Sequence, residues 1–77
     1  MTEKELLKII EKALGVKNIN DKTISKDIPE WDSLGHLSIL TALDEATNGK
    51  VEKIFELSES YSVKEIKQLL RKNNILN

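Results

Sequence analysis

One serine is the residue of this chain best placed for a chemical role. Ser33 lies in the stretch Trp31–Leu37, where an irregular segment meets a run of residues with helical apolar spacing. Asp32, directly before it, is a preferred N-cap residue, so Ser33 is expected in the first turn of a helix. An exposed hydroxyl there lies at the positive end of the helix, where backbone N–H groups and the dipole stabilise an attached phosphate by about 0.3–1 kcal/mol. The pattern therefore indicates a site of covalent modification through a phosphate group.

Two other interpretations of Ser33 stay open at this point. A serine in a first helical turn is common in helical proteins and needs no further role. His36, the single histidine, follows Ser33 by three residues, so the two side chains can share a helix face as a nucleophilic pair. No oxyanion hole is evident, however, and Asp32 is not placed to orient the imidazole from behind. We therefore expect no catalytic residue, and a histidine that faces solvent or a partner.

The composition excludes several other kinds of site. The chain has no cysteine, which rules out disulfides and thiolate metal sites, and we expect no bound metal. Twelve Lys and Arg residues nearly balance thirteen Asp and Glu residues, and residues 32–48 contain no Lys or Arg at all. The three aromatic residues, Trp31, Phe55 and Tyr61, are too scattered to form a base-stacking platform. We therefore predict no nucleic-acid partner.

The length and the hydropathy pattern limit the domain organisation and the location that can be expected. A chain of 77 residues is expected to form one domain, residues 1–77, with one thin core. No apolar run exceeds two residues, so no membrane span is predicted. The first twelve residues are charged and amphipathic and lack the apolar region of a signal peptide. These features favour a cytoplasmic monomer.

Apolar spacing and capping signals predict an all-α fold. Residues 3–14 form the first predicted helix, which a Thr2–Glu5 capping box begins and Gly15 ends. A long connector with isolated apolar anchors follows, over residues 16–31. The second predicted helix covers residues 33–47.

Two more helices are expected in the remaining third of the chain. The apolar residues of 51–60 favour a short helix, although their β-branched and aromatic content suits a helix poorly. A second capping box at Ser62–Glu65 opens a last helix, which ends at Asn73 and Asn74. We therefore predict a small antiparallel four-helix bundle with three longer helices and one short helix.

In this context the tripeptide Asp32-Ser33-Leu34 resembles the attachment motif of acyl and peptidyl carrier proteins. The likeness covers the whole chain in length, helix order and position of the serine, and the longer stretch Trp31–Leu37 resembles carriers outside the housekeeping fatty-acid set. It implies that a phosphopantetheinyl transferase moves a 4′-phosphopantetheine arm from coenzyme A to Ser33. The arm would carry an acyl or aminoacyl group as a thioester and present it to loading and acyl-transferring enzymes. Lipid, polyketide, nonribosomal peptide and specialised glycan or secondary-metabolite pathways all use such carriers.

The resemblance also implies where partners dock. Asp32, Leu34, His36 and Leu37 occupy the start of the recognition helix and are its expected partner contacts. Carriers of this family usually have an acidic recognition helix, whereas here only Asp44 and Glu45 follow the motif, so docking is expected to be more apolar.

Two further expectations concern the interior of the bundle and the cargo. Thr47 stands where the family often has a bulky aromatic residue, and Trp31 is expected to take over part of that packing. The cargo is expected to shelter between the second helix and the short third one. The alternative function is an unmodified helical module that binds proteins through the second helix.

Overall fold

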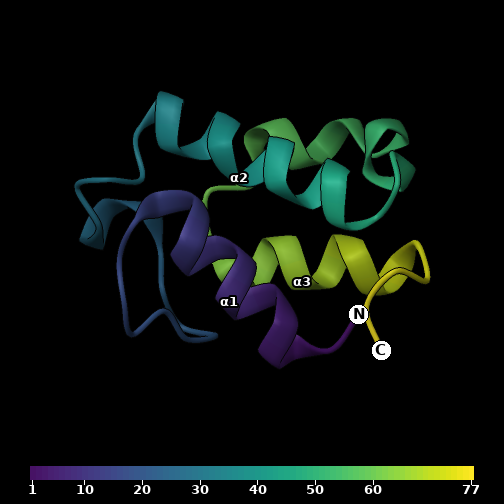
Figure 1. Ribbon diagram of the computed structural model, residues 1–77, viewed down its shortest axis with the longest axis horizontal. Coiled ribbons are helices and arrows are strands. Elements are labelled where there is room, and N and C mark those ends of the chain that lie inside the picture. The colour runs from purple at the N-terminus through teal and green to yellow at the C-terminus, as the bar shows by residue number, and fades with distance from the viewer.

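Three α-helices and three short 3₁₀ helices make up the chain, and no strand is present (Figure 1). The computed structural model describes all 77 residues. In chain order the elements are α1 (Glu3–Leu14), η1 (Ser25–Asp27), α2 (Ser33–Ala46), η2 (Lys50–Lys53), η3 (Phe55–Glu59) and α3 (Val63–Lys72). Helices α1 and α2 match the predicted helices 3–14 and 33–47 to within one residue at each end, and α3 begins directly after the predicted cap residue Ser62.

The predicted caps explain where the helices begin and end. The Thr2 hydroxyl accepts from the Glu5 amide at 3.1 Å, and the Glu5 carboxylate accepts from the Thr2 amide at 2.9 Å. Gly15 ends α1 in the left-handed conformation, at φ 69°. At α3 the Ser62 hydroxyl accepts from the Glu65 amide at 3.1 Å. The Glu65 carboxylate, however, accepts from that same hydroxyl and not from the Ser62 amide. The second capping box is therefore only half formed.

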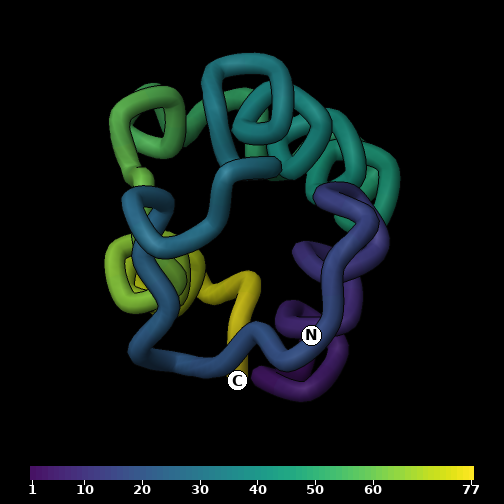
Figure 2. Tube along the Cα trace, turned by 90° about the vertical axis from the view of Figure 1, so that its left-hand side faces the viewer, coloured from purple at the N-terminus to yellow at the C-terminus, as the bar shows by residue number.

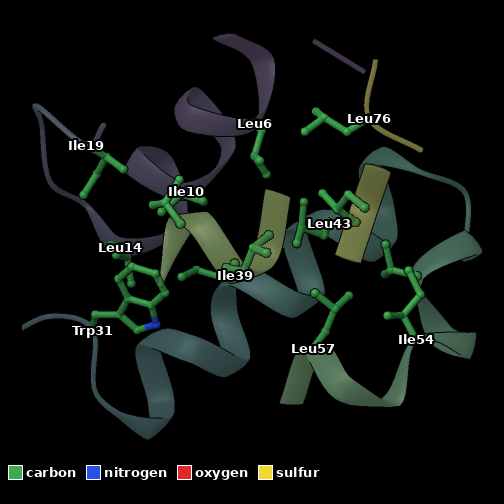
Figure 3. Close-up of a cluster of buried hydrophobic side chains, with 14 residues drawn as sticks. Leu6, Ile10, Leu14, Ile19, Trp31, Ile39, Leu43, Ile54, Leu57 and Leu76 are labelled. Atoms are coloured by element: carbon green, nitrogen blue, oxygen red, sulfur yellow. The ribbon is translucent and has the colours of Figure 1, made fainter. Parts of the chain in front are cut away.

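Fourteen buried hydrophobic residues form one cluster between the helices (Figure 3). Leu6 and Ile10 of α1 point toward Ile39 and Leu43 of α2 in that view. α3 closes the core from the other side with its own buried residues, which are Val63, Ile66 and Leu70. The core thus fixes α2 along its inner face and leaves its outer face to solvent.

The short predicted helix at residues 51–60 is not an α-helix. The chain forms two 3₁₀ turns there, η2 and η3, which meet at Ile54 in a non-helical conformation (φ −96°, ψ 81°). The buried residues Val51, Ile54 and Leu57 recur at intervals of three, which matches the 3.0-residue turn of a 3₁₀ helix better than the 3.6-residue turn of an α-helix. Each of the last two amides in this series donates to the carbonyl three residues before it. This segment runs back alongside α2 (Figure 1).

The connector between α1 and α2 crosses the end of the bundle that carries the start of α2 (Figure 2). Ile19 is buried and pins it to the core, whereas Ile24 is partly exposed and forms an isolated antiparallel bridge with Ser62. At the opposite end the chain termini meet, because the Met1 ammonium donates to the Ile75 carbonyl at 3.1 Å and the Asn77 amide donates to the Met1 carbonyl at 2.9 Å. No helix here combines the length and the hydropathy that crossing a membrane requires.

Candidate functional site

Ser33 is exposed and is the first residue of α2. Asp32 is the N-cap, as predicted: its Oδ1 accepts from the Gly35 amide at 2.8 Å, and its carbonyl accepts from the His36 amide at 2.8 Å. The amides of Ser33 and Leu34 donate to no protein group and are the two free donors of the first turn. The serine hydroxyl therefore lies beside two unused N–H groups at the positive end of a fourteen-residue helix.

Gly35 allows the connector to pass directly over this first turn. A Cβ atom at this position would lie 2.0 Å from the Glu30 carbonyl oxygen and 2.9 Å from a methyl group of Leu14. Only glycine leaves room for such a close backbone approach. The contact fixes the chain immediately before Ser33. The sequence gives no signal for it, since the glycine lies inside a helix with ordinary dihedral angles.

The expectation that His36 faces solvent or a partner is wrong, because its side chain is 2% exposed. The Trp31 indole N–H donates to His36 Nδ1 at 3.0 Å, which places the imidazole proton on Nε2, 2.7 Å from the Leu57 carbonyl oxygen. The Tyr61 ring stacks on the imidazole with centroids 4.1 Å apart. Both ring nitrogens are thus engaged inside the protein, and neither is free to take a proton from Ser33.

This cluster of Trp31, His36 and Tyr61 explains why the histidine turns inward. Trp31 precedes the cap and His36 is the fourth helical residue, the two positions that meet in a hydrophobic staple. The indole is 3% exposed and its ring lies 6.2 Å from the imidazole, nearly parallel to it. Trp31 therefore packs on the first turn of α2, with a histidine as its partner. Thr47, at the other end of α2, is buried and returns its hydroxyl to the Leu43 carbonyl at 2.7 Å.

Exposed apolar side chains lie on α2 close to Ser33 in the sequence, and one more lies on η3. Leu34 is 76% exposed, Leu37 is 59% exposed and Asp32 is also exposed, so three of the four predicted partner contacts are accessible. Phe55, at the start of η3, is 81% exposed and was not among the predicted contacts. The buried residues Val51, Ile54 and Leu57 recur at intervals of three, and Phe55 does not belong to this series. Its position outside the series is the sequence signal that its side chain points outward.

A groove of about 410 Å³ lies between α2 and the η2–η3 segment. Its apolar walls come from both sides and comprise Leu40, Val51, Ile54, Phe55 and Leu57. Thr41, Asp44, Glu52 and Ser58 add polar groups. Asp44 Oδ1 is buried there without a hydrogen-bond partner, and no other buried side-chain oxygen or nitrogen in the protein lacks one.

No three His, Cys, Asp or Glu side chains are arranged to hold a metal ion. Glu3 of α1 pairs with Lys67 and Arg71 of α3, and hydrogen bonds from these two cations lower the pKa of its carboxyl. The pKa of Glu5 is lowered by the hydrogen bonds of the Thr2 cap. Both effects are on the α1 side of the molecule.

No protein-family model matches the chain, no curated protein is significantly similar to it, and no solved structure matches it.

Proposed function

We propose that this protein is an acyl or aminoacyl carrier whose 4′-phosphopantetheine arm is attached to Ser33. The observation that carries the proposal is the exposure of Ser33 at the start of α2, within the sequence Asp32-Ser33-Leu34. A transferase needs a hydroxyl that it can reach from solvent, on a backbone that is held in one position. Asp32 and Gly35 supply that position through the N-cap bond and the contact with Glu30.

The residues around Ser33 fit a phosphodiester. The free amides of Ser33 and Leu34 can donate to its oxygens, and the helix dipole favours its negative charge. When attached, the arm supplies a thiol that binds cargo as a thioester. Asp32 uses only Oδ1 in the cap, which leaves its second oxygen for a transferase or for a metal that the transferase brings.

Leu34 and Leu37 are the proposed contacts for the transferase and for acyl-transferring enzymes. Both project from the exposed face that also presents Ser33, and no Lys or Arg interrupts α2. Apolar contacts of this kind favour recognition by shape and burial over long-range charge attraction. His36 supports this face from inside, by holding Trp31 and Leu57, and is not itself a contact.

The groove between α2 and η2–η3 is the proposed shelter for the cargo. Its walls are mainly apolar, and one wall consists of two 3₁₀ turns with no long helical hydrogen-bond series to break. Loading an acyl group is therefore expected to slow amide exchange in residues 50–57. Unchanged exchange in that segment after loading would place the cargo elsewhere.

The direct test is to incubate the purified protein with coenzyme A and a broad-specificity phosphopantetheinyl transferase and to measure its intact mass. We expect a gain of one arm, a Ser33→Ala variant that gains nothing, and a Ser38→Ala variant that behaves like wild type. Ser38 is a matched control because it is an exposed serine in the same helix.

No mass gain with wild-type protein would overturn the carrier proposal. The exposed Leu34, Leu37 and Phe55 side chains would then favour the alternative, a helical protein-binding module.

A further inference from the structure

The buried His36 side chain is held by three parts of the chain, and the contacts fix the position of its proton. Trp31, at the end of the connector, donates its indole N–H to Nδ1 at 3.0 Å. The Leu57 carbonyl of η3 lies 2.7 Å from Nε2, and the Tyr61 ring stacks on the imidazole. Only a neutral ring with its proton on Nε2 satisfies the indole and the carbonyl together. The histidine therefore joins the connector and η3 to α2 while it is uncharged.

A second proton on the ring would go to Nδ1, because Nε2 already carries the first. Nδ1 would then be a donor that faces the indole N–H, which is also a donor, so the bond to Trp31 would be lost. The other two contacts would persist. A charged N–H donates more strongly to the Leu57 carbonyl, and the face of the Tyr61 ring attracts a cation. Protonation thus acts on one partner, Trp31.

No carboxylate replaces the lost bond. The titratable side chains within two residues of these contacts are Glu30, Asp32, Glu56, Glu59 and Tyr61. The four carboxylates are exposed, and none forms an ion pair with the imidazole, because the ion pairs of the chain all involve Glu3. Two buried N–H groups would then face each other without an acceptor, which is costly until one of them moves. The indole is the group that can reach water, since Trp31 lies outside the helix that holds His36.

We propose that His36 is a proton-sensitive latch on Trp31. The neutral imidazole holds the indole against the first turn of α2, and protonation in mildly acidic solution releases the indole to solvent. The indole is 3% exposed while it is bonded, so its release is a large local change. Trp31 precedes Ser33 by two residues, and the release loosens the end of the connector that presents this serine. The latch does not depend on what Ser33 carries.

The wild-type protein tests the proposal by itself, because it contains one histidine and one tryptophan. A ¹⁵N-labelled sample is titrated from about pH 8 to about pH 5, where histidine changes charge in proteins. NMR follows both imidazole nitrogens, the indole N–H and the backbone amides. In the neutral ring we expect the proton on Nε2. As the ring takes up its second proton, the protection of the indole N–H against solvent exchange should fall about tenfold, the effect of one lost hydrogen bond.

Tryptophan fluorescence gives a second readout of the same event. The Trp31 emission should move to longer wavelength with the same midpoint as the imidazole titration, while amides in the middle of α1 and α3 keep their protection. His36→Asn is the matched control, because its side-chain oxygen can accept from the indole and does not titrate in this range. Its emission should not change with pH. The wild-type titration decides the matter even if this variant folds poorly.

Four results would overturn the proposal. The first is a neutral ring with its proton on Nδ1, and the second is an imidazole that stays neutral down to about pH 5. The third is a protonated imidazole beside an indole that remains protected. The fourth is a loss of protection that α1 and α3 share at the same pH, since this would be unfolding of the whole domain. An emission shift in a folded His36→Asn variant equal to that of wild type would likewise assign the release to another group.

Discussion

The two ends of α2 are built in opposite ways. At its start, the polar side chains of Asp32, Trp31 and His36 have partners inside the protein, and the connector packs against Gly35. Toward its end, Asp44 Oδ1 has no partner, and the facing wall is a pair of 3₁₀ turns. The start of α2 is therefore capped by hydrogen bonds and holds Ser33 in place, whereas the end of α2 contains an unpartnered oxygen and packs against a less regular segment.

The largest loss of stability is expected from Gly35→Ala, a substitution at the start of α2. The new methyl group would lie 2.0 Å from the Glu30 carbonyl oxygen, and backbone cannot move away as a flexible side chain can. Overpacking of this kind is expected to lower the free energy of unfolding by about 3 kcal/mol or more. Denaturant unfolding measures the change.

Gly15→Ala is the matched control for this prediction. Gly15 has a positive φ but nothing within 4 Å of the added methyl group, so only about 1 kcal/mol of backbone strain is expected. Equal losses in the two variants would show that the close approach at Gly35 does not matter.

A second prediction concerns the buried histidine. His36→Phe preserves the stacking on Tyr61 but leaves the Trp31 N–H and the Leu57 carbonyl without partners. The expected loss is about 3 kcal/mol in the free energy of unfolding. Trp31→Phe should then cost less in the His36→Phe background than in wild type, and strictly additive losses would contradict the hydrogen bond.

The third prediction compares the two aspartates directly. Asp32→Ala removes the N-cap bond and is expected to lower the free energy of unfolding by about 1 kcal/mol. Asp44→Asn in the cargo-free protein removes the charge from a partly exposed side chain with one buried, unpartnered oxygen and is expected to be neutral or stabilising by up to about 1 kcal/mol. A clear loss of stability on Asp44→Asn would mean that this carboxylate has a partner inside the protein.

The smallest effect is expected at Glu3, outside both regions. Lys67 and Arg71 lower the pKa of Glu3 in the folded state, so its contribution is present above the ordinary value of 4.5 and is lost as the pH falls through the lower folded value. Glu3→Gln should therefore flatten the fall of the melting temperature between pH 5 and the acid limit, slightly and less so in high salt. An identical dependence of the melting temperature on pH in both proteins would show that the ion pairs of Glu3 do not stabilise the fold.

Local signals in the sequence were sufficient for the three α-helices and for the position of Ser33. The caps at Thr2 and Asp32, and the glycine after α1, act within four residues of themselves, so pattern alone predicts them. The period of three in Val51, Ile54 and Leu57 was also visible and would have favoured a 3₁₀ segment over the short helix.

Contacts between residues that are far apart in the sequence determine the features that local patterns did not predict. His36 is buried because Leu57 and Tyr61, both more than twenty residues further along the chain, pack against it. The need for glycine at position 35 comes from the Glu30 carbonyl, which no pattern of residue types reveals. The groove likewise depends on how far the η2–η3 segment lies from α2.

The most direct measurement is the intact mass of the protein purified from its native host, with the modified residue located by fragmentation. The carrier account predicts that at least part of the protein bears a phosphopantetheine group, and that this group is on Ser33. Material that is always unmodified at Ser33, although the side chain is accessible, would contradict it.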